Sequence, residues 1–303
     1  MGRLEVGFVL VTRHWGPERT LPRWGDIRRL ALDAEAFGLD SVWLEDELLW
    51  RPRTGEPLGF WDGVSMTAAV AAVTSSITVG SWVLSALHRN PGIIAKTAET
   101  LDEISGGRFI FGLGAGHTEP GQARSFGLPE DRVSSRFAEA VRVIVPLLRE
   151  GRADFQGTFH AAHDLPQTPQ GPRPGRIPLM LAAQGPKGMR LAAEHADIWS
   201  CFAQDRSDVV EFGPRIAALE AACAAVGRDP ATIGRSAGVD FHPLEAAPDP
   251  NGAWIGGSTE QMADQLRAFR DAGYTQVALF PTPATVEALE AVAPVMELLH
   301  ADE

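Results

Sequence analysis

Three acidic residues follow one another directly after a short apolar run. Glu45, Asp46 and Glu47 come after residues 42–44, which have the composition of a buried strand. Side chains alternate along extended backbone, so we expect Glu45 and Glu47 to point one way and Asp46 the other. A carboxylate that points into a pocket can accept or deliver a proton. The simpler interpretation is an acidic loop exposed to solvent.

A glycine-rich segment follows another apolar run and ends in a histidine. It reads Gly112-Leu113-Gly114-Ala115-Gly116-His117. The glycines lack the spacing of the dinucleotide-binding fingerprint and lie in mid-chain. We interpret them as a place where a flat ligand approaches the backbone. His117 at the edge of that ligand is a candidate proton-transfer residue, although a structural histidine fits the sequence equally well.

A third segment favours phosphate binding. An apolar stretch runs into a predicted helix through Ala183, Gln184, Gly185, Pro186 and Lys187. The first turn of a helix has free N–H groups and the positive end of the helix dipole, and both attract phosphate. Lys187 adds a positive charge. The alternative is an ordinary turn with proline at the first position of the helix.

Aromatic residues are frequent near the predicted ends of the apolar runs. Ligand pockets are mostly apolar, so we expect part of this set to wall a substrate pocket and the rest to be ordinary core. The candidates for the pocket are Phe8, Trp50, Trp61, Trp199 and Trp254.

The elements that must position these residues alternate along the whole chain. Eight apolar runs separated by amphipathic stretches predict helices covering a mostly parallel sheet. The predicted strands are residues 4–11, 40–45, 77–84, 108–114, 178–183, 197–203, 235–241 and 276–281. The predicted helices begin near Trp24, Phe60, Pro91, Ser134, Pro186, Ser207, Ser258 and Thr285. Eight such units predict an α/β protein with one closed (β/α)8 TIM barrel over residues 1–303, whose site lies at the C-terminal ends of the strands.

Two Pro/Gly-rich stretches do not fit this minimal pattern. They are residues 151–177 and 242–257. Long loops in compact domains often cover sites, so we expect both insertions at the C-terminal face of the barrel.

Charge and cysteine content restrict the class of protein. The formal net charge of −12 over 303 residues repels nucleic acid and anionic membranes, so we expect neither as a partner. Cys201 and Cys223 are the only cysteines and lack C-x-x-C spacing. Glu5 beside the short apolar run 6–11 argues against a signal peptide or a membrane span. These features predict a reduced, cytoplasmic protein.

Histidine spacing argues against a metal-dependent barrel hydrolase. No H-x-H sequence stands at a strand end, and the close pair His160 and His163 lies in the first insertion. Metal sites of that class need ligands at the strand ends, so we expect no metal.

Four stretches resemble one known family, the luciferase-like flavin and deazaflavin oxidoreductases. They occur in family order and, with the helices between them, cover nearly the whole chain: GLDSVWLEDE, RNPGIIAKTAETLDEISGGRFIFGLGAGH, LAAQGPKGMRLAAEHADIW and IGGSTEQMADQLRAFRDAGYTQVALF. The resemblance implies an eight-stranded barrel that holds the ring system of its cofactor at the C-terminal mouth, and often a homodimer.

The resemblance also implies a cofactor and the residues that bind it. The G-P phosphate loop and the compact length favour the deazaflavin coenzyme F420 over FMN. In relatives an irregular third strand supports the ring, frequently with a non-prolyl cis peptide, which maps to Ser81–Trp82. Gln184 stands where relatives carry a small residue. The implied cofactor-binding residues are Asp46, Ser81, Trp82, Gly114, Gly116, Ala183, Gln184, Gly185, Pro186 and Lys187.

The resemblance implies catalytic roles for two residues. Relatives commonly carry His at position 47, and sugar-phosphate dehydrogenases of the superfamily pair it with a Glu after the G-x-G loop. This chain has Glu47 and His117 at these positions, and a Glu and a His can still divide proton removal and delivery. We therefore predict hydride transfer between the cofactor and a small or medium organic substrate. The alternatives are an FMN-dependent monooxygenase that uses dioxygen and reduced flavin from an external reductase, and a non-catalytic flavin-binding protein.

Overall fold

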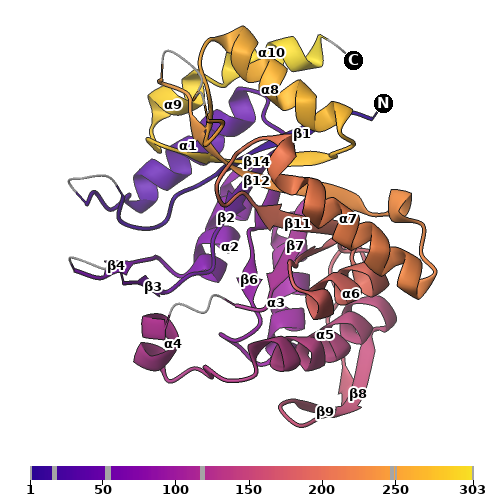
Figure 1. The fold of residues 1–303 in the computed structure, drawn as a ribbon. Helices are drawn as coiled ribbons and strands as arrows, with labels where there is room; N and C mark the ends of the chain where they lie inside the picture. The colour runs from indigo at the N-terminus through magenta and orange to yellow at the C-terminus, as the bar shows by residue number, and fades with distance from the viewer. Residues whose placement is uncertain are drawn as a thin grey trace.

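Eight parallel strands form a closed barrel (Figure 1). The computed structural model describes residues 2–15, 19–51, 56–116, 120–245, 249 and 251–301. The strands follow the chain around the barrel, and the last pairs with the first. In order they are β1 (Glu5–Val9), β2 (Ser41–Leu44), β5 (Thr78–Ser81), β7 (Phe109–Gly114), β10 (Leu179–Ala182), β11 (Ile198–Phe202), β12 (Gly234–His242) and β14 (Gln276–Pro281). The predicted barrel is confirmed.

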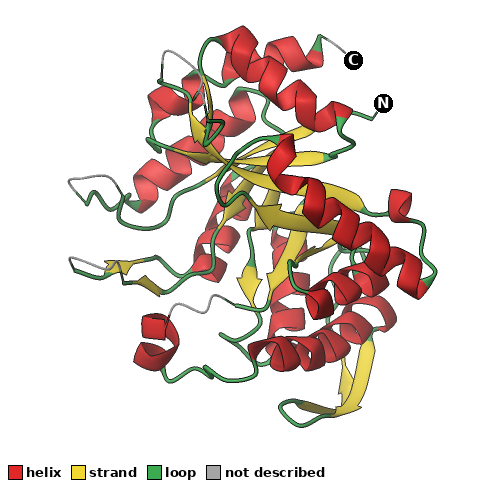
Figure 2. Cartoon of the chain, viewed as in Figure 1, coloured by secondary structure: helices red, strands yellow, loops and turns green. Residues whose placement is uncertain are grey.

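Helices cover the outside of the barrel (Figure 2). Several begin where the sequence predicts, because their caps supply partners for free N–H groups. The carboxylate of Asp62 accepts from Ser65 N, and Ser258 forms a capping box with Gln261. The helices are α1 (Trp24–Ala36), α2 (Gly63–Val73), α3 (Pro91–Ile104), α5 (Val133–Glu150), α6 (Pro186–His195), α7 (Val209–Val226), α8 (Thr259–Asp271), α9 (Val286–Glu290) and α10 (Ala293–His300).

Smaller elements extend the loops that follow the strands. A hairpin of β3 (Leu49–Trp50) and β4 (Leu58–Gly59) follows β2, and α4 (Pro120–Phe126) follows β7. The pairs β6 (Leu84–Ser85) with β7 and β13 (Ile255–Gly256) with β12 lengthen the sheet at the same end. A 3-10 turn, η1 (Pro230–Thr232), leads into β12.

The first insertion lies elsewhere than predicted. Residues 151–177 form an antiparallel hairpin of β8 (Arg152–Gln156) and β9 (Ala161–Pro166), which lies beyond α5 in Figure 1. The Glu139 carboxylate of α5 accepts hydrogen bonds from the backbone at Thr158, Phe159 and His160. The insertion follows a helix and not a strand, so it packs on the outer layer instead of covering the C-terminal face. The second insertion follows β12 and begins at that face.

A tryptophan fills the interior of the barrel. Trp43 is completely buried, and its Nε1 donates to Ser41 Oγ at 2.9 Å. Two glycines on the neighbouring strands make room for it: a Cβ at Gly7 would lie 2.3 Å from the indole nitrogen, and one at Gly80 would lie 2.1 Å from the ring. The barrel is therefore a packed core, and open space begins only above this ring.

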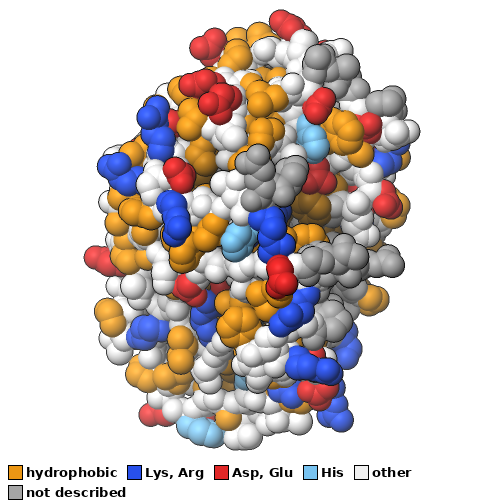
Figure 3. Space-filling model, turned by 90° about the vertical axis from the view of Figure 1, so that its left-hand side faces the viewer, with side chains coloured by type: hydrophobic (Ala, Val, Ile, Leu, Met, Phe, Trp, Pro, Cys, Tyr) orange, Lys and Arg blue, Asp and Glu red, His pale blue; other side chains and the backbone are white. Residues whose placement is uncertain are grey.

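The surface carries mixed charge. Figure 3 shows one face, on which acidic and basic side chains are interspersed with apolar ones. In the described part of the chain, no helix is long and apolar enough to cross a membrane.

Replacement of Gly80 by alanine tests the packing of Trp43. We expect Gly80→Ala to lower the free energy of unfolding by about 3 kcal/mol, because overpacking a rigid core forces neighbours out of position. Urea unfolding followed by circular dichroism measures this. The matched control is Gly213→Ala in α7, where an added Cβ meets no atom within 4 Å and a gain of about 0.5 kcal/mol is expected. Equal effects of the two changes would contradict the packing argument.

Candidate functional site

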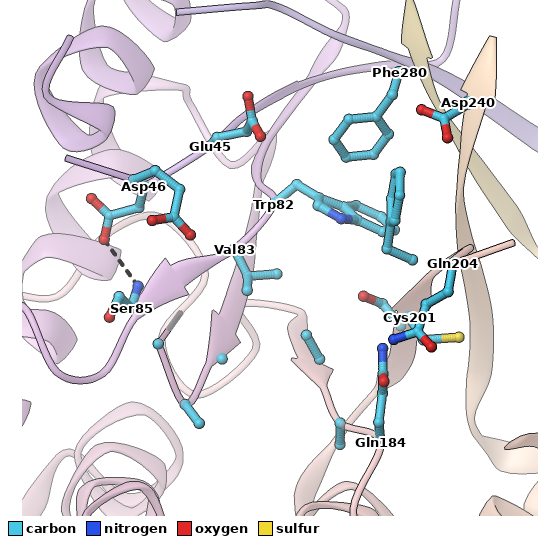
Figure 4. A pocket seen from close by; sticks show the side chains of 18 of the residues that line it. Glu45, Asp46, Trp82, Val83, Ser85, Gln184, Cys201, Gln204, Asp240 and Phe280 are labelled. Atoms are coloured by element: carbon cyan, nitrogen blue, oxygen red, sulfur yellow. Dashed lines mark hydrogen bonds between the residues drawn. The ribbon is translucent and has the colours of Figure 1, made fainter. Parts of the chain in front are cut away.

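A cavity of about 740 Å³ opens at the C-terminal ends of the barrel strands. The end of every barrel strand, or the loop that follows it, contributes to its wall. Figure 4 shows the side chains pointing into it. This is where barrel enzymes carry their sites, because the loops after the strands meet there.

The floor of the cavity is aromatic. Trp82 packs edge-on against Trp43 at a centroid distance of 5.5 Å and against Phe280 at 6.0 Å, and Phe202 packs against Phe280 at 4.7 Å. Gly238 on β12 allows the three upper rings to converge, since a Cβ there would lie about 3 Å from each of them. Edge-to-face packing fixes the ring planes, so the floor is rigid.

One half of the cavity has small side chains and continues to a helix terminus. Gly114, Ala115, Gly116, Ala182 and Ala183 form its wall. A second cavity of about 490 Å³ shares part of this wall and extends along the loop to Lys187 and Gly188 in the first turn of α6. The two cavities share Ala115, Ala182, Ala183 and Gln184, so the second lies next to the mouth cavity on the side of α6.

The start of α6 is open. Gly185 caps the helix, and a Cβ added there meets no atom within 4 Å. The wall behind the loop is held by Trp199, whose Nε1 donates to Ala183 O at 2.8 Å. An exposed helix start with free N–H groups and a nearby lysine suits a phosphate, so the residues present fit the phosphate end of a flavin or deazaflavin cofactor.

The third strand is interrupted at the floor of the cavity. The prediction of a cis bond at Ser81–Trp82 is wrong by one residue, since the non-prolyl cis peptide joins Trp82 and Val83. The sheet ladder explains the difference: Ser81 Oγ donates to Gly112 O, and Trp82 N donates to Leu44 O at 2.8 Å. These bonds keep the preceding peptide in the sheet, and the irregularity falls after them.

Asp46 is the centre of a buried ion-pair network. Its side chain is fully buried and accepts from Ser85 N at 2.9 Å and from both terminal nitrogens of Arg89 at 2.6 and 3.0 Å. Burial alone would raise the pKa of Asp46, but hydrogen bonds and charge from His88 and Arg89 outweigh it and hold the pKa below the ordinary value. Asp46 is therefore ionised, and it ties the end of β2 to β6.

Gln122 connects the two elements that extend the mouth. Its Oε1 accepts from Leu48 N at 2.7 Å and from Leu49 N at 2.8 Å, and its Nε2 lies 3.4 Å from His88 Nε2. Helix α4 and the β3–β4 hairpin are thus held together next to the Asp46 network.

Two further carboxylates line the cavity beside one arginine. Burial raises the pKa of Glu45, with Arg13 opposing this and Glu47 adding to it. Burial also raises the pKa of Asp240, against the charges of His242 and Arg13. Sequence reasoning missed Arg13 and Asp240 as site residues and gave Glu45 no role of its own. Alternation along β2, which turns Ser41 and Trp43 inward, was the signal available for Glu45.

The other predicted site residues are distributed differently. Glu47, Asp46, Trp82, Gly114, Gly116, Ala183 and Gln184 line the mouth cavity, while Gly185, Pro186 and Lys187 line its extension. Ser81 lies behind the wall, bonded to β7. His117 lies outside the described residues, so its catalytic role stays a prediction.

The five aromatic residues predicted for the pocket do not line either cavity. Phe8 and Trp199 are completely buried between the barrel and its helices. Trp50 is 40% exposed on β3, Trp61 donates to Pro22 O, and Trp254 stacks on His242 at 4.6 Å. The aromatic wall consists of Trp82, Phe202 and Phe280 instead.

Neither a thiol nor a metal centre stands out in this cavity. Burial raises the pKa of Cys201 to about 12, so its thiol is protonated at neutral pH. Among the residues that the structure describes, no group of three or more His, Cys, Asp or Glu is placed to hold a metal ion.

Residues 4–247 match the model of the luciferase-like monooxygenase family, to which the chain therefore belongs. This agrees with the cavity at the mouth of an eight-stranded barrel. The curated proteins to which the chain is similar include monooxygenases and an F420-dependent dehydrogenase. A solved structure of the same fold, at 16% identity, contains a modified FMN.

Two curated relatives and one solved structure illustrate the range. The chain is 35% identical over 179 residues to the pyrimidine monooxygenase RutA of Cronobacter sakazakii, covering 56% of this chain and 52% of the relative. It is 32% identical over 205 residues to the F420-dependent glucose-6-phosphate dehydrogenase of Kineococcus radiotolerans, covering 65% and 56%. The chain thus spans about half the length of these relatives. The F420-dependent tetrahydromethanopterin reductase of Methanopyrus kandleri shares the fold, with a TM-score of 0.78, 20% identity and coverage of 98% and 100%.

Breaking the Asp46 network should destabilise the protein in a pH-dependent way. We expect Asp46→Asn to lower the free energy of unfolding at neutral pH by about 3 kcal/mol, since it leaves the largely buried Arg89 without its closest partner. A carboxyl with a lowered pKa stabilises the fold above its unfolded value of 3.8, and this contribution is lost as the pH falls through the lowered pKa. The free energies of unfolding of the original protein and of Asp46→Asn should therefore become equal in acid.

Urea unfolding at a series of pH values measures this difference. Asp264→Asn is the control, because Asp264 pairs with Arg267 while its side chain is 73% exposed, and such pairs contribute below about 1 kcal/mol. A difference for Asp46→Asn that stays constant down to strong acid would show that charge is not its cause.

Proposed function

We propose that the protein is an F420-dependent oxidoreductase that transfers a hydride between the deazaflavin and a small or medium organic substrate. The observation that carries this proposal is the mouth cavity together with the adjoining cavity at the start of α6. The small-walled half of the first suits a flat ring beside Val83 and Gly114, and the second, at Gly185 and Lys187, suits a phosphate. We call these two parts the cofactor groove.

The chain positions the cofactor and excludes water around it. Val83 would support the ring, with Trp82 at its edge, and the first turn of α6 would hold the phosphate. When bound, F420 supplies the hydride-carrying ring, which no side chain can replace. The Gly185-Pro186 pair and the similarity to an F420-dependent dehydrogenase favour this cofactor over FMN.

Glu47 is the proposed proton-handling residue. It lines the cavity next to the Asp46 network, which fixes the backbone on which Glu47 stands. A carboxylate at this place can take a proton from a substrate hydroxyl or return one. His117 is proposed as its partner on the sequence resemblance alone.

A second candidate is an FMN-dependent monooxygenase that uses dioxygen and reduced flavin from an external reductase. The similarity to RutA favours it. Oxygen consumption on addition of reduced FMN and substrate would distinguish this reaction from hydride transfer, which proceeds equally without oxygen.

Titration of the apo-protein with F420 and with FMN tests the choice of cofactor. Trp82 lies in the floor of the cavity, so a bound ring should quench tryptophan fluorescence. We expect micromolar or tighter binding of F420 and at least tenfold weaker binding of FMN. A preference for FMN would support the monooxygenase, and binding of neither would overturn both proposals.

A charge reversal at the helix start tests the phosphate site. Gly185→Asp retains a good helix cap but places a negative charge where the phosphate would lie, so the Kd for either cofactor should rise by about 30-fold or more. Gly185→Ser is the matched neutral cap and should change Kd less than about threefold. Equal Kd values for the two variants would place the phosphate elsewhere.

Glu47→Gln tests proton transfer. We expect turnover to fall by about 100-fold, as is typical for loss of a general acid or base, while the Kd of the cofactor changes little. Steady-state kinetics with a turned-over alcohol or carbonyl substrate measures the first, and fluorescence titration the second. Unchanged turnover would remove Glu47 from the mechanism.

A further inference from the structure

The half of the mouth cavity away from α6 differs from the cofactor groove in its chemistry. Glu45 and Asp240 lie on opposite sides of the aromatic floor formed by Trp82 and Phe280 (Figure 4). Arg13 also lines this half, and its charge acts on both carboxyl groups.

The carboxylates of Glu45 and Asp240 can accept hydrogen bonds from a ligand. In the described part of the chain, no residue donates a hydrogen bond to the carboxylate of Glu45 or of Asp240. Asp46 differs, because its carboxylate oxygens accept hydrogen bonds from Ser85 and Arg89. A partly buried carboxylate loses contact with water, and this loss is not compensated when no donor faces it. A ligand that brings N–H groups would remove this cost.

A third polar group points to a ligand independently of the acidic residues. Ser200 on β11 is completely buried and lines the same cavity, and its hydroxyl has no hydrogen-bond partner among the residues that the structure describes. Buried hydroxyl groups are normally paired. Ser200 lies between the cofactor groove and Asp240, so a molecule on the aromatic floor would reach it.

We propose that this half of the cavity is a substrate subsite for a flat, compact molecule that presents N–H groups or a nitrogen-borne positive charge to Glu45 and Asp240. The molecule stacks on Trp82 and Phe280, and the hydroxyl of Ser200 bonds to its edge. This assignment rests on the proposed function, because it leaves the other half of the cavity to the cofactor.

The same arrangement excludes one class of substrate. A phosphorylated or polycarboxylate molecule would meet Glu45 and Asp240, and among the described residues that line this cavity Arg13 is the one basic side chain. Repulsion of like charges in a partly buried site discriminates strongly between ligands of similar shape.

Three probes of nearly the same shape test the subsite. Benzamidine carries a positive charge and N–H groups, benzamide carries N–H groups alone, and benzoate carries a negative charge. The probes are titrated into the full chain by calorimetry, with and without F420, at about 0.15 M salt to screen distant charges. We expect the Kd to rise from benzamidine to benzamide to benzoate, and benzoate to bind at least tenfold more weakly than benzamidine. Equal or tighter binding of benzoate would overturn the proposal.

Variants show whether the preference arises at this site. Glu45→Gln and Asp240→Asn should each reduce the ratio of the benzoate and benzamidine Kd values by about fivefold or more, whereas Arg13→Gln should increase it. Glu290→Gln is the control, because it removes the same charge from an exposed position on α9. If the control reduces the ratio as much as Glu45→Gln, the net charge of −12 is the cause and the proposal fails.

The two proposals fail separately. Cofactor binding is read from tryptophan fluorescence without any probe, and probe binding is read from heat without any cofactor. If the protein prefers benzamidine but binds no cofactor, the subsite is supported and the proposed function fails. If it binds the cofactor but does not prefer benzamidine, the proposed function is supported and the subsite fails.

Discussion

The packing of Trp43 between two glycines is the constraint on which the site depends. The indole fills space inside the barrel that a side chain at Gly7 or Gly80 would otherwise occupy. Because the ring also contacts Trp82 edge-on, it sets the height and tilt of the cavity floor. The open volume begins above this pair.

The residues that line this volume fall into two groups of different chemistry. On one side the wall consists of glycine and alanine, so the backbone itself can approach a flat ligand. On the other side Glu45, Arg13 and Asp240 present charge above aromatic rings. A cofactor and a substrate in the two halves of one cavity would be neighbours, and holding two reactants together in this way favours direct transfer.

The fold was largely predictable from sequence, and the site only in part. Apolar runs of strand length separated by amphipathic stretches are sufficient to predict a barrel. Where both faces of a strand are buried, however, composition does not tell which face lies inside. Phe8 therefore resembled a pocket residue although its neighbour Val9 points inward, and Trp199 packs under the helices while Ser200 faces the cavity.

Residues that meet through closure of the barrel were the hardest to foresee. Arg13 lies in the loop after the first barrel strand and Asp240 on the seventh strand, both in stretches without a motif. Their proximity to Glu45 results from the circular arrangement alone. The motif-bearing loops after the second, fourth and fifth strands could be singled out because local composition already marked them.

Arg89 has a consequence for more than one element of the structure. Its guanidinium binds Asp46, which holds the amide of Ser85, and Asp62, which holds the amide of Ser65. One cation therefore contacts a carboxylate at the end of β2 and another at the start of α2, and its loss would remove a bond at both places.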